Sequence, residues 1–251
     1  MHSAPNKEAD CNGSSDAGTA QRLAAVLARI RAAELRFGRV PDSVELLAVS
    51  KVQPATLIAD AFDAGQRAFG ESYVHEALEK QARLQSLPLT WHFIGRIQGN
   101  KTRDIATHFD WVHSLFDIRH ARRLDAQRPP ERGPLPVCVQ VNLSGEASKG
   151  GLAPAEVAGF IDQCASLPNL RIEGLMTLPA PGADFDAQRR PFAALRELRD
   201  RLARTNLPLP VLSMGMTDDL EAAVAEGATI VRVGTAIFGP RPAAKPETTD
   251  H

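Results

Sequence analysis

Short apolar runs alternate with stretches of helical periodicity along most of the chain. The first run, residues 46–51, lies between Pro41 and Pro54 and ends in Lys51. Its nearly unbroken apolar character is typical of a parallel strand that is buried on both faces. Seven similar runs follow it. We therefore expect eight strands, at residues 45–50, 67–70, 90–94, 111–115, 136–143, 170–177, 210–214 and 229–234.

The segments beside these runs have the periodicity of amphipathic helices. In the first of them, Leu23, Val26, Leu27 and Ile30 share one helical face. Helices are expected at residues 20–37, 54–65, 71–86, 98–108, 117–128, 154–167, 186–205 and 217–226, with a further helix beginning at Thr235.

The order of these elements predicts the fold. Alternation of strand and helix indicates a parallel sheet with crossover helices. Eight such units fit a single (β/α)8 barrel better than an open doubly wound α/β sheet. The open sheet would usually carry a glycine-rich turn after its first strand, whereas Ser50-Lys51-Val52-Gln53 contains no glycine. We expect one barrel domain at residues 19–241, with disordered tails at 1–18 and 242–251.

Composition narrows the class of partner. A net charge of −1 over 251 residues gives no electrostatic reason to expect nucleic acid or an acidic membrane surface. No apolar run reaches the roughly 18 residues of a membrane span, and the polar N-terminus has no signal-peptide core. Cys11, Cys138 and Cys164 lack the spacing of a metal site. We therefore expect free thiols, no metal and a cytoplasmic protein.

Lys51 stands at the carboxyl end of the first predicted strand. In α/β folds ligands collect at that edge of the sheet. A strand-end lysine can also extend to solvent with no further role. Its position alone leaves both interpretations open.

Two loops late in the chain have the residues of an anion site. The loop after the seventh strand contains Ser213, Met214 and Gly215, and the turn after the eighth contains Gly234 and Thr235. Hydroxyls, glycine amides and a helix N-terminus bind phosphate, which barrels often hold after strands seven and eight. Either loop alone could be a cap or a turn. Together with a lysine after the first strand, they favour an anion site.

A lysine beside a phosphate cradle indicates a Schiff base to a phosphorylated aldehyde, above all pyridoxal 5′-phosphate (PLP). The amine must be neutral to react, so its pKa must fall from about 10.4 through burial or a nearby cation. Arg232 is a candidate cation because it shares a strand face with Ile230 and Gly234. Facing the pyridine nitrogen, it would keep that nitrogen unprotonated and the cofactor a weak electron sink. An ion pair with a helix acid is the alternative role of Arg232.

Four more polar residues near these segments need an interpretation. Asp218 and Asp219 suit a helix start but would repel a phosphate, so we expect both to point away from it. His92 and His113 could be general bases. Strand histidines flanked by apolar residues are more often hydrogen-bonded core residues, and we expect that role here.

Seven motifs connect these segments to a known family. They are Ala48-Val49-Ser50-Lys51, Phe69-Gly70-Glu71-Ser72-Tyr73, Trp91-His92-Phe93-Ile94-Gly95-Arg96-Ile97-Gln98-Gly99-Asn100-Lys101, Gln140-Val141-Asn142, Gly174-Leu175-Met176-Thr177, Ser213-Met214-Gly215-Met216 and Val231-Arg232-Val233-Gly234-Thr235-Ala236-Ile237-Phe238-Gly239. In this order, across most of residues 20–241, the chain resembles the pyridoxal phosphate homeostasis proteins.

The resemblance implies a PLP fold type III barrel, similar to the N-terminal domain of alanine racemase, with the cofactor on Lys51. It also implies phosphate contacts from the 213–215 loop and the 234–235 turn, with Arg232 near the ring. One position departs from the family pattern. Ser72 stands where the family usually has asparagine, and a shorter side chain there can lose a contact to the cofactor.

Two classes of function fit these residues. The first is a PLP-binding protein that holds and delivers the cofactor in vitamin B6 homeostasis, without catalytic residues and with apo forms of PLP-dependent enzymes as recipients. The second is a PLP-dependent amino-acid racemase or decarboxylase. Racemisation needs acid/base groups on both faces of the cofactor, whereas Tyr73 is the only tyrosine and we expect no second domain.

The resemblance favours the first class. A cofactor-free Schiff-base aldolase is a third interpretation, and it would require the phosphate loops to hold a sugar phosphate. We expect a monomer, because no helix face is more apolar than a barrel requires.

Overall fold

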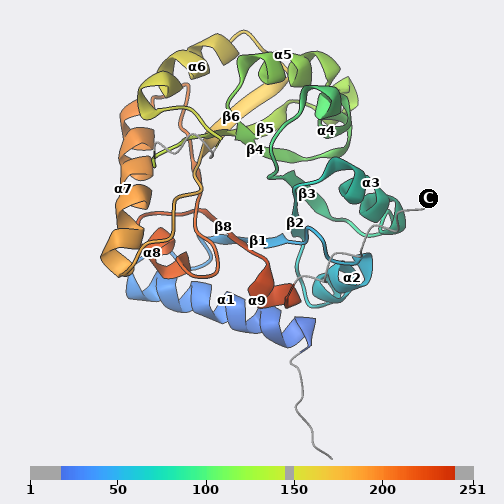
Figure 1. Ribbon diagram of the computed structural model, residues 1–251, viewed down its shortest axis with the longest axis vertical. Coiled ribbons are helices and arrows are strands. Elements are labelled where there is room, and N and C mark those ends of the chain that lie inside the picture. The colour runs from blue at the N-terminus through green and yellow to red at the C-terminus, as the bar shows by residue number, and fades with distance from the viewer. Residues whose placement is uncertain (1–17, 145–149, 241–251) are drawn as a thin grey trace, which may run out of the picture.

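The computed structural model describes residues 18–144 and 150–240. In this part of the chain eight parallel strands close into a barrel in the order β1-β2-β3-β4-β5-β6-β7-β8. Helices surround the strands on the outside (Figure 1). The expected (β/α)8 barrel is therefore confirmed. The predicted tails at 1–18 and 242–251 lie outside the described residues, except for Gly18.

All eight predicted strands are present, most of them within one or two residues of the predicted bounds. They are β1 (Glu45–Val49), β2 (Ala68–Glu71), β3 (Thr90–Phe93), β4 (Trp111–Leu115), β5 (Leu135–Gln140), β6 (Leu170–Met176), β7 (Val211–Ser213) and β8 (Ile230–Val233). Several end earlier than predicted, because the residues that follow turn over the mouth of the barrel. Ser50 is one example, since its carbonyl accepts a hydrogen bond from the Gln53 amide in a tight turn.

The helices follow the same plan. They are α1 (Thr19–Arg36), α2 (Ala55–Asp63), α3 (Val74–Arg83), α4 (Thr102–His108), α5 (Ile118–Gln127), α6 (Val157–Cys164), α7 (Phe185–Leu202), α8 (Leu220–Ala225) and α9 (Thr235–Phe238). The α8 helix begins three residues after the predicted start, because the Asp219 carboxylate accepts the Met216 amide and residues 217–219 form a turn. Among the described residues, no helix combines the length and apolar character needed to cross a membrane.

Two apolar layers fill the molecule. The larger one lies between the strands and the surrounding helices and includes Phe93, Phe109 and Phe192. The smaller one consists of Leu47, Ala68 and Ile230, with Ile94 and Val211 packed against it. Because alternate residues of a barrel strand point inward, this second cluster lies inside the barrel. Cys138 and Cys164 are buried free thiols, as predicted.

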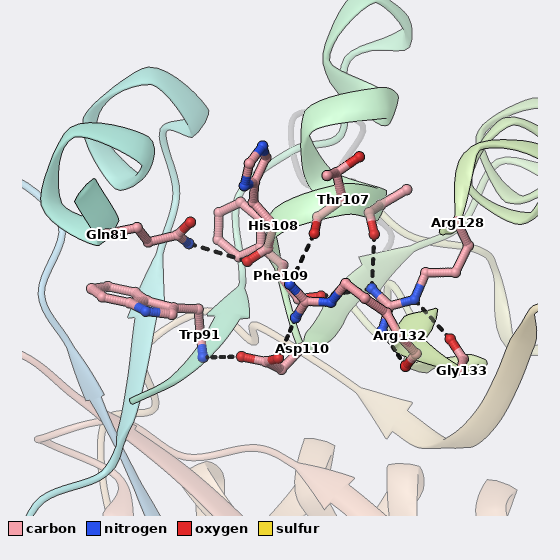
Figure 2. A network of polar contacts seen from close by, with 10 residues as sticks. Gln81, Trp91, Thr107, His108, Phe109, Asp110, Arg128, Arg132 and Gly133 are labelled. Carbon is pink, nitrogen blue, oxygen red and sulfur yellow. Dashed lines mark hydrogen bonds and ion pairs between the residues drawn. The ribbon is translucent and has the colours of Figure 1, made fainter. Parts of the chain in front are cut away.

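A polar network joins the loops that lead into β4 and β5 (Figure 2). The Arg128 guanidinium donates to the carbonyls of Ala106 (2.8 Å), Phe109 (2.9 Å) and Gly133 (2.9 Å). The Asp110 carboxylate accepts the Trp91 amide at 2.7 Å. These loops lie at the amino ends of the strands, the end that usually serves stability in such barrels.

The α1 helix precedes the first strand and packs along α8 and α9 (Figure 1). Arg22 donates from Nε to the Ile237 carbonyl in α9 at 2.7 Å. Arg29 donates to the Thr217 carbonyl and to Glu221, both at 3.0 Å. The helix thereby holds, from outside, the segments that follow β7 and β8.

Candidate functional site

A cavity of about 510 Å³ opens at the carboxyl end of the strands. Its wall is formed by residues at or just after the ends of β1, β2, β3, β6, β7 and β8. They are Val49, Lys51, Ser72, Ile94, Met176, Leu178, Met216, Thr217, Asp218, Arg232, Gly234, Thr235 and Ala236. This is the end of a barrel where ligand sites are built.

Five of the eight residues predicted for the site line this cavity. They are Lys51, Ser72, Arg232, Gly234 and Thr235. The barrel brings them together from β1, β2 and β8, which are neighbours in the closed sheet. Lys51 follows directly after the turn residue Ser50, so its side chain enters the cavity from the β1 side.

The other three predicted residues, Ser213, Met214 and Gly215, lie outside the cavity wall. The Ser213 and Met214 side chains are fully buried. The Gly215 carbonyl accepts the Arg232 amide at 2.9 Å. Their predicted contact with a phosphate stays a prediction, and the structure gives Ser213 a different set of partners.

Arg232 is buried and holds two neutral partners. It donates from Nη1 to the Ser213 hydroxyl and from Nη2 to the Thr177 carbonyl, both at 2.8 Å. Burial lowers the pKa of Arg232 to about 10, so it remains a cation at neutral pH. None of the described ion pairs includes Arg232, although the charge of Asp219, at the start of α8, acts on it and opposes the effect of burial on its pKa.

Ser213 extends this contact into a hydrogen-bond chain across the barrel interior. Its hydroxyl lies 2.8 Å from His113 Nδ1, and His113 Nε2 lies 2.9 Å from His92 Nδ1. An arginine can only donate, so the Ser213 hydroxyl accepts from Arg232, and its own proton is available for His113 Nδ1. In that arrangement His113 donates from Nε2 to His92 Nδ1, both imidazoles carry their proton on Nε2, and the buried His92 Nε2 has no hydrogen-bond partner among the described residues.

Both histidines are core residues, as predicted. Burial lowers the pKa of His92 to about 3. Burial, with His92 and the positive charge of Arg232, also lowers the pKa of His113 well below its ordinary value. The His92 ring stacks on Trp111 with a centroid distance of 5.7 Å. Both imidazoles are therefore neutral at neutral pH, and the buried Arg232 places positive charge at the floor of the cavity.

Two glycines allow the backbone to approach closely at the site. A Cβ on Gly234 would meet the Val49 carbonyl oxygen at 3.0 Å. Gly215 has a φ of 93°, and a Cβ there would meet the Ala223 Cβ at 2.5 Å. A side chain at either position would displace a cavity loop.

One detail of the loops differs from expectation. Asp218 is among the residues that line the cavity, although we expected it to point away from a phosphate. The helix predicted to begin at Thr235 is present as α9, with Gly234 at its cap position.

Sequence reasoning missed two groups around the site. The first group is the apolar wall of the cavity, formed by Ile94, Met176 and Leu178. These residues stand at strand ends whose apolar sequence is the same as that of ordinary core residues. A buried ion cluster behind Lys51, described below, includes Lys80 of α3. Its signal in the sequence was a Glu-to-Lys pair at i,i+4 spacing, which is usual on exposed helix faces.

Comparison with known proteins places this arrangement in a family. The family model for the alanine racemase N-terminal domain matches residues 21–242. The pyridoxal phosphate homeostasis protein of Pseudomonas aeruginosa is 56% identical over 222 residues, which cover 88% of this chain and 95% of that protein. The Escherichia coli protein of the same name is 48% identical over 228 residues, covering 88% and 96%. The chain belongs to the pyridoxal phosphate homeostasis protein family.

Solved structures agree with this family assignment. PipY of Synechococcus elongatus PCC7942, solved with PLP bound, is 41% identical with a TM-score of 0.76, covering 88% of this chain and 100% of that chain. Alanine racemase of Corynebacterium glutamicum is 19% identical with a TM-score of 0.63, covering 90% of this chain and 64% of that chain. The second likeness shows a shared fold, so the expected similarity to the alanine racemase barrel is confirmed.

Proposed function

We propose that this homeostasis-family protein binds PLP in the cavity at the barrel mouth, as a Schiff base on Lys51, and holds it without turning over a substrate. One observation carries the proposal. Lys51, Arg232 and the Gly234–Thr235 turn line a single cavity, in a chain that is 41% identical to a protein solved with PLP bound.

The residues of the cavity fit each part of the cofactor. A volume of about 510 Å³ is within the usual range for small-ligand sites. Ile94, Met176 and Leu178 offer apolar surface to a ring, and Thr217 with the 234–236 turn offers hydroxyls and backbone to a phosphate. The hydrogen-bond partners of Arg232 are neutral, which leaves its charge to act on an anionic or electron-rich ligand.

Bound PLP supplies an aldehyde carbon that condenses reversibly with an amine. Lys51 would hold the group through its Nζ, and the chemistry supplied there would be reversible imine formation, in which the carbonyl oxygen leaves with two amine protons as water. Arg232 keeps its positive charge next to the ring, since its pKa is about 10. That charge disfavours a proton on the pyridine nitrogen and so disfavours carbanion chemistry.

The absence of turnover is supported by the position of the single tyrosine. Tyr73 is 58% exposed and lies outside the cavity wall, so it offers no acid/base group opposite Lys51. The protein would act as a monomeric reservoir from which apo forms of PLP-dependent enzymes take the cofactor. Asp218 on the cavity rim is an alternative acid/base group to a tyrosine. The racemase function therefore also needs a test.

Reduction and peptide mapping test the covalent site. Purified protein is treated with PLP and borohydride, and the modified lysine is identified by mass spectrometry. We expect visible absorbance of the Schiff base and modification of Lys51. Lys51→Ala should lose the stoichiometric label, whereas the matched variant Lys101→Ala should keep it. Protein that takes up no PLP, or wild-type protein labelled mainly on another lysine, would overturn the proposal.

A proton-exchange experiment separates the reservoir from an enzyme. The PLP-loaded protein is incubated with single L-amino acids in deuterated water, and the α-proton signal is followed by NMR. We expect no exchange above that of free PLP. Exchange at an enzyme-like rate that disappears in Asp218→Asn would instead support a racemase.

A further inference from the structure

The residues on both sides of Lys51 are held by charged side chains from β2 and α3. The Ser50 hydroxyl donates to Glu71 Oε1 at 2.6 Å, and the Ser50 carbonyl accepts from Lys80 Nζ at 2.7 Å. The Val52 amide donates to Glu76 Oε1 at 2.6 Å. The backbone that carries Lys51 is thus fixed one residue before it and one residue after it.

Val52 has a conformation that its side chain disfavours. Its φ is 57°, in the left-handed region, where a β-branched residue is a genuine outlier. Its side chain is 42% exposed, so tight packing does not impose this geometry. The hydrogen bond to Glu76 opposes the strain, together with the turn bond from the Gln53 amide to the Ser50 carbonyl. Strain of this kind persists where surrounding structure holds it, and it gathers at functional sites.

Lys80 connects the two carboxylates. It is buried and donates to Glu71 Oε1 at 2.8 Å and to Glu76 Oε1. Burial raises the pKa of Glu71 despite the nearby ammonium of Lys80. The second Glu71 oxygen has no hydrogen-bond partner among the described side-chain contacts. Loss of the Lys80 charge would therefore leave the buried Glu71 carboxylate uncompensated and release the Ser50 carbonyl.

We propose that Lys80 and Glu76 are positioning residues for Lys51. They hold the strained turn at residues 50–52 so that the Lys51 amine is preorganised in the cavity. The idea rests on the proposed Schiff base at Lys51, and it extends that site to two residues that do not line it. Preorganisation of this kind speeds reaction because the amine need not search for its reactive position.

The competing explanation is that the ion cluster only stabilises the fold. The two can be separated at Val52, because glycine adopts the left-handed conformation without strain. If Glu76 acts by holding the turn, Val52→Gly should make Glu76 dispensable for reactivity. A purely stabilising role predicts no such rescue. Glu79→Ala is the matched control, since Glu79 lies one turn away on α3 and pairs only with the exposed His75 among its described ion pairs.

The experiment measures Schiff-base formation with PLP by stopped-flow absorbance. It also measures the Lys51 labelling rate with trinitrobenzenesulfonate by peptide mapping, and the melting temperature. We expect Glu76→Ala to slow Schiff-base formation at least tenfold and to change the rate of Lys51 labelling. Adding Val52→Gly should restore both rates to within about threefold of wild type, while the melting temperature stays lowered. Glu79→Ala should match wild type.

Rates that stay slow in the folded double variant would overturn the proposal, as would wild-type rates in Glu76→Ala. The three-bond coupling between the amide and α protons of residue 52 provides a readout that needs no cofactor. A left-handed Val52 in wild type that relaxes in Glu76→Ala supports the proposal, and an unchanged coupling contradicts it. If wild-type protein takes up no PLP, the proposed function fails, while the labelling rate and the coupling still decide the role of Glu76.

Discussion

His113 Nδ1 on β4 lies 2.8 Å from the Ser213 hydroxyl on β7, on the opposite side of the barrel interior. The contact joins His113 to the same hydroxyl that accepts from Arg232, which can only donate. The floor of the cavity is therefore a polar scaffold with one permanent charge. This scaffold gives Ser213 a role that differs from a direct contact with phosphate.

Ser213→Ala distinguishes the two roles. It removes the acceptor of Arg232 Nη1 and the hydrogen-bond partner of His113 Nδ1, and unpaired buried groups of this kind are strongly unfavourable. We expect the free energy of unfolding, measured by urea denaturation, to fall by about 2 kcal/mol. The exposed Ser166→Ala should change it by less than about 0.5 kcal/mol. Unchanged stability together with weaker PLP binding would instead favour the phosphate contact that the family resemblance implies.

The buried histidines predict a dependence of stability on pH. The pKa of His92 is about 3 in the folded protein and about 6.5 in the unfolded chain. The unfolded state therefore binds an extra proton below about pH 6.5, so the free energy of unfolding falls with decreasing pH, by up to about 1.4 kcal/mol per pH unit for each such histidine. The contribution is fully present above pH 6.5 and is lost progressively towards pH 3.

His92→Gln tests this linkage. Glutamine keeps an acceptor for His113 but does not titrate. Between pH 7 and pH 5, the loss of unfolding free energy should be smaller in the variant than in wild type by about 2 kcal/mol. His75→Gln, on the exposed face of α3, should leave the pH dependence as in wild type. Equal slopes for His92→Gln and wild type would mean that His92 binds its proton equally in the folded and unfolded states.

A side chain at Gly234 should weaken PLP binding. Alanine at this position would place its Cβ 3.0 Å from the Val49 carbonyl oxygen, so the turn must move away from β1. We expect Gly234→Ala to raise the dissociation constant for PLP at least tenfold, which is about 1.4 kcal/mol, in an absorbance titration. Gly159→Ala is the matched control: a Cβ in α6 would meet no atom within 4 Å, and binding should not change. Wild-type affinity in Gly234→Ala would contradict a role for the turn in binding.

The barrel was predictable from sequence because its strands are buried on both faces and so appear as separate apolar runs. Lys51 and Arg232 were predictable because a lysine or arginine at the end of such a run is unusual. The hydrogen-bond chain from His92 through His113 to Ser213 was not predictable from sequence. Its members come from strands whose inward faces meet only when the sheet closes. The left-handed turn at Val52 has no sequence signal, because valine is among the residues least expected there.

Substitution of Arg128 should lower the free energy of unfolding without weakening PLP binding. Its guanidinium satisfies the carbonyls of Ala106, Phe109 and Gly133, within the polar network of Figure 2. These loops precede β4 and β5, so they lie at the end of the barrel opposite the cavity. Methionine can fill much of its volume but cannot donate. We expect Arg128→Met to lower the free energy of unfolding by about 2–3 kcal/mol, because buried carbonyls lose their donor.

At a temperature where this variant remains folded, its PLP dissociation constant should stay within about twofold of wild type, since uncoupled sites act independently. Arg132→Met is the comparison, because its ion pair with Asp110 is partly exposed and should contribute less than about 1 kcal/mol. A strong loss of PLP affinity in folded Arg128→Met would show that the two ends of the barrel are coupled. The division between a stability end and a binding end would then not hold for this protein.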